Sequence, residues 1–293
     1  MNQAIVIIPT TGAPELEYAI QSVLAQTVPT DVLVVFDGQM FDRPLNLPPD
    51  ERIHKLVLPF NTGRGRTHAV YRHLPSEREA LGNFTEKILP YYREHPSWYG
   101  VRVMMSASVM VNHDYVMVLD QDNWLRPDHV ETCINKLAIN PDLELVHALR
   151  NIHRSDASFI CRDDCESLGN HRGISGFMID TNCYFYRTDF FMRTAHLWLW
   201  GWGADRVYRY RIVRDFGWKV IACTGRYTVN YRLGSNPGSL AEENILTGND
   251  RMYEQHGRKT NMPWADAREN DDRAADAPQQ TNNSIHVPEK NHA

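Results

Sequence analysis

Two aspartates separated by one residue stand at the end of an apolar run over residues 116–119. Because successive side chains of a strand point to opposite faces, Asp120 and Asp122 are expected on the same side of the chain. Two carboxylates at an exposed strand end suit Mg²⁺ or Mn²⁺, and such an ion would grip a diphosphate. A strand that ends in a turn rich in Asp and Asn accounts for the same residues without any chemistry.

A third acid, Asp205, follows a segment that holds three tryptophans and two glycines. Aromatic faces stack on sugar or base rings, and glycine lets a ligand approach the backbone. An acid beside such a surface could act as a general base toward an acceptor hydroxyl. The same residue could instead be an acid of the first turn of a helix, where the helix dipole favours it. Asp180, which follows an apolar run, is the alternative candidate for the base or for orienting an acceptor.

The elements that must position these acids alternate between strands and helices. Apolar runs at residues 4–8, 31–36 and 53–58 predict strands, and apolar spacing over residues 15–25 predicts a helix. This order indicates an α/β fold with a mostly parallel sheet flanked by helices. Ligands of such sheets bind beyond the carboxyl ends of the strands. The polar residues that fall at those ends are Thr10, Asp37, Asn61 and Asp120.

The remainder of the chain continues the alternation less regularly. Further strands are expected at residues 143–149, 177–186 and 218–223. Further helices are expected at residues 101–112, 127–138 and 204–216, with helix starts at 65–73 and 189–194. An acidic stretch at residues 162–166 is either a second cation site or a solvated loop.

Composition excludes several classes of protein. The 293 residues carry a net charge of −5, which gives no general attraction to nucleic acid or to anionic membranes. No window approaches the roughly eighteen apolar residues of a membrane span, so no membrane anchor is expected. Five cysteines with irregular spacing fit free thiols in a reducing compartment, so we expect a cytoplasmic protein. Residues 259–293 are rich in Asp, Asn, Gln and Pro, and we expect a disordered C-terminal tail there.

Five segments resemble, in order and spacing, the family 2 glycosyltransferases with the GT-A fold. They are Val-Ile-Ile-Pro-Thr at 6–10, Ser-Val-Leu-Ala-Gln-Thr at 22–27, Val-Val-Phe-Asp-Gly at 34–38, Asn-Thr-Gly-Arg-Gly-Arg at 61–66 and Asp-Gln-Asp at 120–122. The family often carries a second acid before the one that matches Asp37, and a Glu before the one that matches Asp205. This chain has Phe36 and Ala204 at those positions.

The resemblance implies a single GT-A domain in two halves. Residues 1–130 would bind the nucleotide sugar, and residues 131–258 would bind the acceptor. Pro9 and Thr10 would line the base pocket, and Asp37 would accept a hydrogen bond from the uracil or ribose.

The resemblance also implies roles for the remaining site residues. Asn61 and Arg66 would contact the donor from the glycine-bearing loop, with Arg66 reaching a phosphate. Asp120 would face the ribose or sugar and, together with Asp122, would bind Mn²⁺ or Mg²⁺. Asp205 would be the catalytic base.

The expected activity is therefore inverting, metal-dependent transfer of a hexose or pentose from a nucleoside-diphosphate sugar to a hydroxyl group. The resemblance favours a uridine diphosphate (UDP) sugar as donor. The acceptor is open between saccharide, protein, lipid and DNA, and virus-encoded enzymes that glycosylate hydroxymethylated DNA bases have a similar layout. A catalytically inactive sugar-binding protein is the non-enzyme alternative. A nucleotidyltransferase is disfavoured because residues 10–14 hold one glycine and no basic residue.

Overall fold

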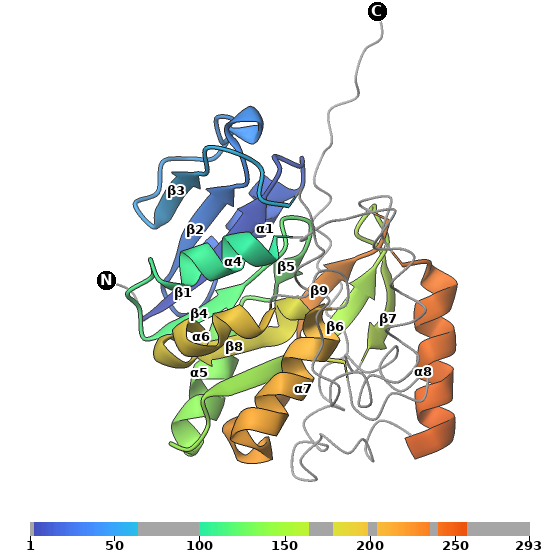
Figure 1. Cartoon of the computed structure of the whole chain (residues 1–293). Coiled ribbons are helices and arrows are strands. Elements are labelled where there is room, and N and C mark those ends of the chain that lie inside the picture. Colours follow the sequence, from blue (N-terminus) through green and yellow to red (C-terminus); the bar gives the residue numbers. More distant parts are fainter. Residues whose placement is uncertain (1–2, 64–99, 164–177, 199–203, 235–239, 257–293) are drawn as a thin grey trace, which may run out of the picture.

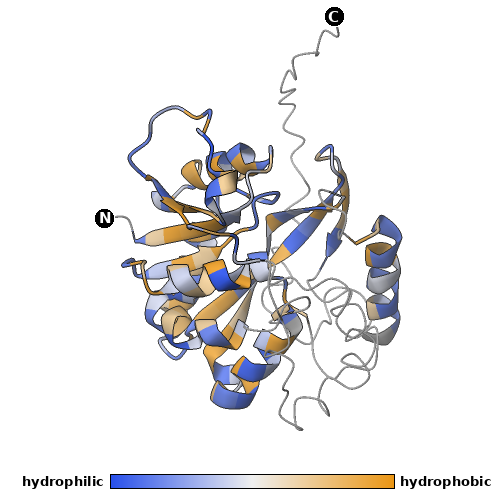
Figure 2. Ribbon diagram, turned by 45° about the horizontal axis from the view of Figure 1, so that its top comes forward, coloured by the Kyte–Doolittle hydropathy of each residue, from blue (hydrophilic) through white to orange (hydrophobic). Residues whose placement is uncertain are grey.

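The computed structural model describes residues 3–63, 100–163, 178–198, 204–234 and 240–256. Within these ranges the strands form one sheet, and helices pack around it (Figure 1). Figure 2 shows that the strands are largely hydrophobic, whereas the outward faces of the helices carry hydrophilic residues. The hydrophobic core therefore lies between the sheet and the helices that cover it.

The N-terminal half of the sheet is parallel. Its strands are β1 (Ala4–Thr10), β2 (Thr30–Phe36), β3 (Ile53–Val57) and β4 (Tyr115–Val118). They lie in the order β3-β2-β1-β4 and all run in one direction. Every residue of β2 is buried, and so is every residue of β1 except Pro9. Strands covered on both faces read as continuous apolar runs, which is why the sequence predicts them well.

The C-terminal half of the sheet mixes directions. Its strands are β5 (Trp124–Leu125), β6 (Leu145–His153), β7 (Phe159–Asp163), β8 (Tyr184–Arg187) and β9 (Ile221–Arg232). β8 runs antiparallel to both β4 and β6, and β9 runs parallel to β6. β5 is antiparallel to β9, and β7 is antiparallel to β6. The strands β1 to β4, β6 and β9 thus share one direction, and the expected α/β class with a mostly parallel sheet is confirmed.

Helices pack on the sheet and on one another. They are α1 (Leu16–Leu24), α4 (Val101–Ser108), α5 (His129–Ile139), α6 (Thr188–Thr194), α7 (Ala204–Phe216) and α8 (Glu242–His256). α1 packs on β2 and β5, and α5 packs on β6 and β9. α4 packs on β1 and against α6, while α8 stands beside β7 at the far end of the sheet (Figure 1).

Differences from the expected elements have local causes. The strand expected at residues 177–186 is confirmed only from Tyr184 onward, because Asp180 caps a 3₁₀ turn at Thr181–Cys183. The strand expected at residues 218–223 begins only at Ile221, after a 3₁₀ turn at Trp218–Val220, and continues to Arg232. β5, β7 and α8 were not predicted, since β5 has two residues and few apolar side chains of α8 are buried.

Some expectations fall on parts of the chain that the structure does not describe. The helix start at residues 65–73 and the C-terminal tail at residues 259–293 lie outside the described residues. Across the described ranges, no helix has both the length and the apolar character that a bilayer span requires. The described cysteines, Cys133, Cys161, Cys183 and Cys223, are free thiols.

Candidate active site

The strand ends that the sequence singles out meet at one edge of the sheet. Asp37 follows β2 directly, Asp120 follows β4 after one further residue, and both strands pair with β1. The amide of Asp37 donates a hydrogen bond of 2.9 Å to the carbonyl of Thr10, the last residue of β1. The structure therefore brings Thr10, Asp37 and Asp120 to the same edge, as the topology predicts.

Asp37 organises the loop that contains Asn61. Its Oδ1 accepts hydrogen bonds from the amide and hydroxyl of Thr62, at 2.7 and 2.8 Å. Its Oδ2 accepts from the amide of Gly63 and from Asn61 Nδ2, both at 3.1 Å. A carboxylate has about four acceptor positions, and these donors fill them. The contact between Asp37 and the uracil or ribose, which the resemblance implied, would have to share one of these hydrogen bonds.

Glycine makes this close approach possible. Gly38 has φ of 127°, a conformation that favours glycine over residues with a Cβ atom. A Cβ atom on Gly38 would lie 3.0 Å from the amide nitrogen of Asn61. The Asp-Gly pair at the end of β2 therefore lets the loop fold directly onto the acid.

Gln121, between the two acids of the Asp-Gln-Asp turn, ties that turn to the loop after β1. Its Oε1 accepts hydrogen bonds from Thr10 Oγ1 at 2.6 Å, Thr11 N at 3.1 Å and Ala13 N at 3.2 Å. The sequence analysis assigned no role to Gln121. The alternation expected for a strand does not extend to these residues, because β4 ends at Val118 and Gln121 and Asp122 lie in a turn.

Asn182 holds Asp120. Its Oδ1 accepts a hydrogen bond of 2.6 Å from the amide of Asp120, and its Nδ2 donates to Asp120 Oδ2 at 2.9 Å. Asn182 Nδ2 also donates to Asp180 Oδ1 at 2.8 Å. Asp180, the alternative candidate for the base, is thus engaged with Asn182 and is 7% exposed.

A buried arginine stands behind this pair. Arg150 is 1% exposed, and its guanidinium lies 2.5 Å from Asp180 Oδ2 and 2.6 Å from Asp163 Oδ2. The same guanidinium lies 4.7 Å from the ring centroid of Tyr231. For Asp163 the solvated-loop interpretation of residues 162–166 is therefore wrong, since this residue is 0% exposed and ends β7. Asp163 instead pairs with Arg150, which in turn holds Asp180.

The acids gather negative charge around Asp120. The pKa of Asp120 is raised to about 7, chiefly by burial and also by the charges of Asp122, Asp180 and Asp205, while the hydrogen bond from Asn182 lowers it. Like charges at short range disfavour the ionised form of each carboxyl group. The structure thus puts Asp120, Asp122, Asp180 and Asp205 in one electrostatic neighbourhood, and such a neighbourhood attracts a cation.

Asp205 lies in the first turn of α7 and is half-buried. The aromatic segment before Asp205 was expected to offer ring faces to a sugar or base, but its described tryptophan packs in the core. Trp198 is 1% exposed and stacks on Tyr208 with ring centroids 4.0 Å apart, so its ring belongs to the core and offers no face to a sugar. The other two tryptophans of the segment lie outside the described residues.

The donor set fits a hard divalent cation. Among the described residues, no group of three or more His, Cys, Asp or Glu side chains is placed to hold a metal ion by itself. Mg²⁺ usually needs only one or two protein carboxylates, because substrate phosphates and water complete its coordination. Asp120 and Asp122 could supply those carboxylates. The next residue, Asn123, is fixed because its Oδ1 accepts a hydrogen bond of 2.9 Å from Arg232 N.

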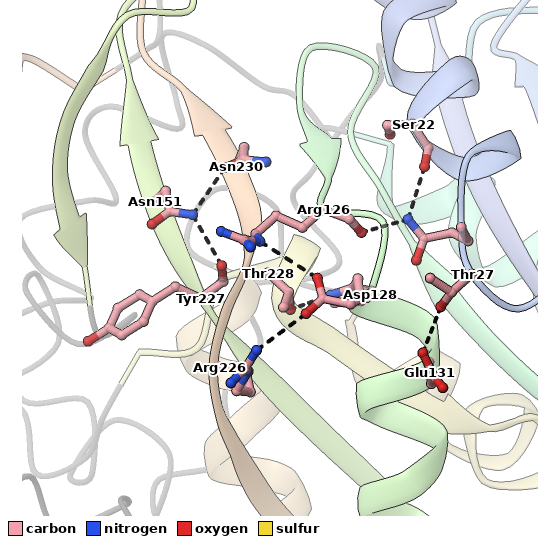
Figure 3. A network of polar contacts seen from close by, with 12 residues as sticks. Ser22, Thr27, Arg126, Asp128, Glu131, Asn151, Arg226, Tyr227, Thr228 and Asn230 are labelled. Carbon is pink, nitrogen blue, oxygen red and sulfur yellow. Dashed lines mark hydrogen bonds and ion pairs between the residues drawn. The ribbon is translucent and has the colours of Figure 1, made fainter. Parts of the chain in front are cut away.

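A second polar network surrounds Arg126 and Asp128, in the segment that follows the Asp-Gln-Asp turn and β5 (Figure 3). Gln26 Nε2 donates to the carbonyl of Arg126 at 2.7 Å, and Asp128 pairs with Arg126 and Arg226 across 3.6 and 3.5 Å. These contacts join the end of α1, the start of α5 and β9. They therefore anchor the segment that carries Asp122 to both halves of the sheet.

Two predicted donor contacts remain to be placed. Pro9 lies in β1 beside Thr10 and is half-buried. Arg66 lies outside the described residues. A basic side chain without a predicted role also lies near this loop. It is Arg102 on α4, whose Nη1 lies 3.5 Å from the carbonyl oxygen of Thr62.

No protein-family model and no curated protein matches the chain. Among solved structures, S. aureus TarS 1–349 in complex with UDP aligns with a TM-score of 0.48 and 12% identity over 91% of this chain and 68% of that one. The complex of TarS 1–349 with UDP-GlcNAc gives 0.43 and 12% over 91% and 69%. A function must therefore be argued from the residues of the site.

Proposed function

We propose that this chain is an inverting, metal-dependent glycosyltransferase of the GT-A type with a UDP-sugar as donor. One observation carries the proposal. At the carboxyl edge of a mostly parallel sheet, Asn182 bridges Asp120 and Asp180, and Asp122 and Asp205 add negative charge near Asp120, beside a loop that Asp37 organises. Several carboxylates beside a tight glycine-containing loop suit a diphosphate that binds together with a divalent cation.

The donor side of the site would consist of the first two strand ends and the loop. Pro9 and Thr10 would line the base, and the loop at residues 61–63 would contact the nucleoside with its backbone. Arg66 would reach a phosphate. Asp37 would act mainly through the loop, because its carboxylate oxygens already accept four hydrogen bonds.

Asp120 and Asp122 would hold Mn²⁺ or Mg²⁺. When bound, the ion would supply positive charge to the leaving diphosphate. The backbone around both acids is fixed by Gln121 and Asn123, so the carboxylates would meet the ligand without reorganisation.

Asp205 would serve as the general base. It would accept the proton of the acceptor hydroxyl while that oxygen forms a bond to the anomeric carbon of the sugar. The bond from that carbon to the diphosphate oxygen would break on the opposite face, and UDP would leave with the electron pair. One displacement of this kind inverts the anomeric configuration.

The proposal is tested by thermal unfolding and by UDP release. The wild-type chain should gain thermal stability from UDP with Mn²⁺, because a ligand that binds only the folded state stabilises it. It should release UDP from at least one UDP-sugar when an acceptor panel is present, containing saccharides, peptides and DNA with hydroxymethylated bases. EDTA should abolish both effects.

Asp122→Asn should lose the UDP shift and the UDP release. Asp114→Asn makes the same change at an exposed position before β4 and should behave like the wild type. If no UDP-sugar stabilises the wild-type chain or releases UDP, the proposed function is wrong. If EDTA leaves both effects intact, metal dependence is wrong.

A further inference from the structure

Asn182 contacts Asp120 at both its backbone and its side chain. The amide of Asp120 donates to Asn182 Oδ1 at 2.6 Å, and Asn182 Nδ2 donates to Asp120 Oδ2 at 2.9 Å. A carboxylate otherwise rotates about its Cβ–Cγ bond. Two contacts from one planar amide fix this rotation together with the backbone that carries it. The orientation of Asp120 thus depends on a residue 62 positions away in the chain.

Asn182 is itself held rigidly. It is 1% exposed, and its amide donates to Asp180 Oδ1 at 3.0 Å while its Nδ2 donates to the same oxygen at 2.8 Å. The other oxygen of Asp180 lies 2.5 Å from Arg150 Nη1, and Arg150 pairs with Asp163 at the end of β7. A chain of buried hydrogen bonds and ion pairs therefore runs from β7 through β6 to Asp120.

The hydrogen bonds leave one side of Asp120 available. Asn182 binds Oδ2, and within the described ranges no hydrogen bond reaches Oδ1. A ligand that is oriented by its partners and keeps one oxygen open is the arrangement that an incoming cation requires. Groups that orient a metal ligand from behind change metal affinity or activity about 10–100-fold when mutated.

We infer that Asn182 is a positioning residue: it turns one carboxylate oxygen of Asp120 toward the divalent cation of the donor complex. This inference rests on the proposed function, which provides the cation and its diphosphate. Asn182 contacts neither donor nor acceptor in this scheme, and it acts through Asp120 alone.

The test measures Mn²⁺ alone, by electron paramagnetic resonance of the free ion during titration of the full chain. Asn182→Ala should raise the Kd for Mn²⁺ about 10–100-fold. Asn249→Ala is the matched control, because Asn249 is also buried, at 6% exposure, and its Nδ2 donates to the carbonyl of Arg162 at 3.0 Å and not to Asp120 or Asp180. The control should bind Mn²⁺ within about twofold of the wild type.

Folding is monitored in parallel by circular dichroism and thermal unfolding. If Asn182→Ala does not fold, Asn182→Ser replaces it, since serine keeps a single hydroxyl donor and should give a smaller loss of Mn²⁺ affinity. Unchanged Mn²⁺ affinity in a folded Asn182 variant would overturn the inference. An equal loss in Asn249→Ala would overturn it as well, because the effect would then be general.

The two proposals fail in different ways. A wild-type chain that binds Mn²⁺ but neither binds UDP nor releases it from any UDP-sugar contradicts the proposed function, while the effect of Asn182 on Mn²⁺ stands. A wild-type chain that uses a UDP-sugar with Mn²⁺, and an Asn182→Ala variant that binds Mn²⁺ equally well, contradict the positioning role alone. A wild-type chain that binds no Mn²⁺, either alone or together with UDP, contradicts both.

Discussion

The hydroxyl of Thr10 donates a hydrogen bond of 2.6 Å to Oε1 of Gln121, across a separation of 111 residues. The contact joins the end of the first strand to the turn that carries two acids. Two further amides, of Thr11 and Ala13, donate to the same oxygen. The side chain of Gln121 thus fixes the turn that carries Asp120 and Asp122 to the loop after β1.

Gln121→Ala should weaken the site more than it weakens the fold. Each lost hydrogen bond contributes about 1 kcal/mol, and the amides freed in this variant are partly reachable by water, so we expect a loss of about 1–2 kcal/mol in the free energy of unfolding. UDP affinity in the presence of Mn²⁺ should fall about tenfold, as a turn that can shift holds its acids less well. Urea unfolding and calorimetric UDP titration measure the two quantities. Gln21→Ala, at an exposed position of α1, should change neither.

Asp37→Asn should loosen the loop at residues 61–63. The new NH₂ group would face the backbone N–H of Thr62 or of Gly63, which cannot accept a hydrogen bond, so at least one of the present hydrogen bonds is lost. We expect about 1–3 kcal/mol of destabilisation and faster amide hydrogen exchange at Thr62 and Gly63. Asp42→Asn is the control, since Asp42 is exposed and pairs with Lys55 at the surface, where an ion pair contributes little. Unchanged exchange at Thr62 in Asp37→Asn would show that the loop holds its shape by other means.

The free energy of unfolding should fall with acid, because two buried histidines outweigh Asp120, whose raised pKa gives the folded chain one extra proton in the same range and so acts in the opposite direction. His129 and His147 are 0% and 3% exposed, and burial lowers the pKa of each to about 4. Their ordinary pKa is about 6.5, so below this pH the unfolded chain binds protons that the folded chain does not. The stability that both histidines contribute is fully present above about pH 6.5 and is lost as the pH falls toward 4, at up to about 1.4 kcal/mol per pH unit for each.

Urea unfolding at a series of pH values between about 7 and 4.5 checks this dependence. His129→Gln removes one of the two groups and should reduce the slope by about one proton, although loss of the contact of 2.8 Å to Thr228 Oγ1 also lowers the starting stability. A free energy of unfolding that stays constant over this range would contradict the assignment of both histidines as buried neutral groups.

The parallel half of the fold and the acids of the site could be predicted because their signals are local. β1 and β2 are largely continuous apolar runs, Asp37 follows β2 directly, and Asp120 and Asp122 lie in the turn just after β4. The topology of a parallel sheet then brings these strand ends together without any knowledge of side-chain contacts. Sequence reasoning succeeds where the position along a strand decides the position in space.

The partners of these acids could not be predicted for the opposite reason. Asn182 stands in a run that reads as ordinary strand, and only the pairing of β8 with β4 brings it to Asp120. Arg150 also reads as ordinary strand, and the pairing of β6 with β7 and β8 brings it to Asp163 and Asp180. Trp198 shows the same limit, since aromatic faces suit a sugar and a hydrophobic core equally well. The structure shows that Trp198 belongs to the core, because its ring stacks on Tyr208, and nothing in the local sequence indicates that contact.

Asp205→Asn should impair catalysis and leave donor binding intact. The amide cannot accept a proton from the acceptor hydroxyl, so kcat should fall about 10²–10⁴-fold. UDP affinity with Mn²⁺ should stay within about twofold, since Asp205 is proposed to contact the acceptor and not the diphosphate. Asp215→Asn, at the other end of α7 and paired with Arg214 at the surface, should keep full activity. If Asp205→Asn loses UDP affinity as strongly as Asp122→Asn does, Asp205 serves the cation or donor, and another residue must accept the proton.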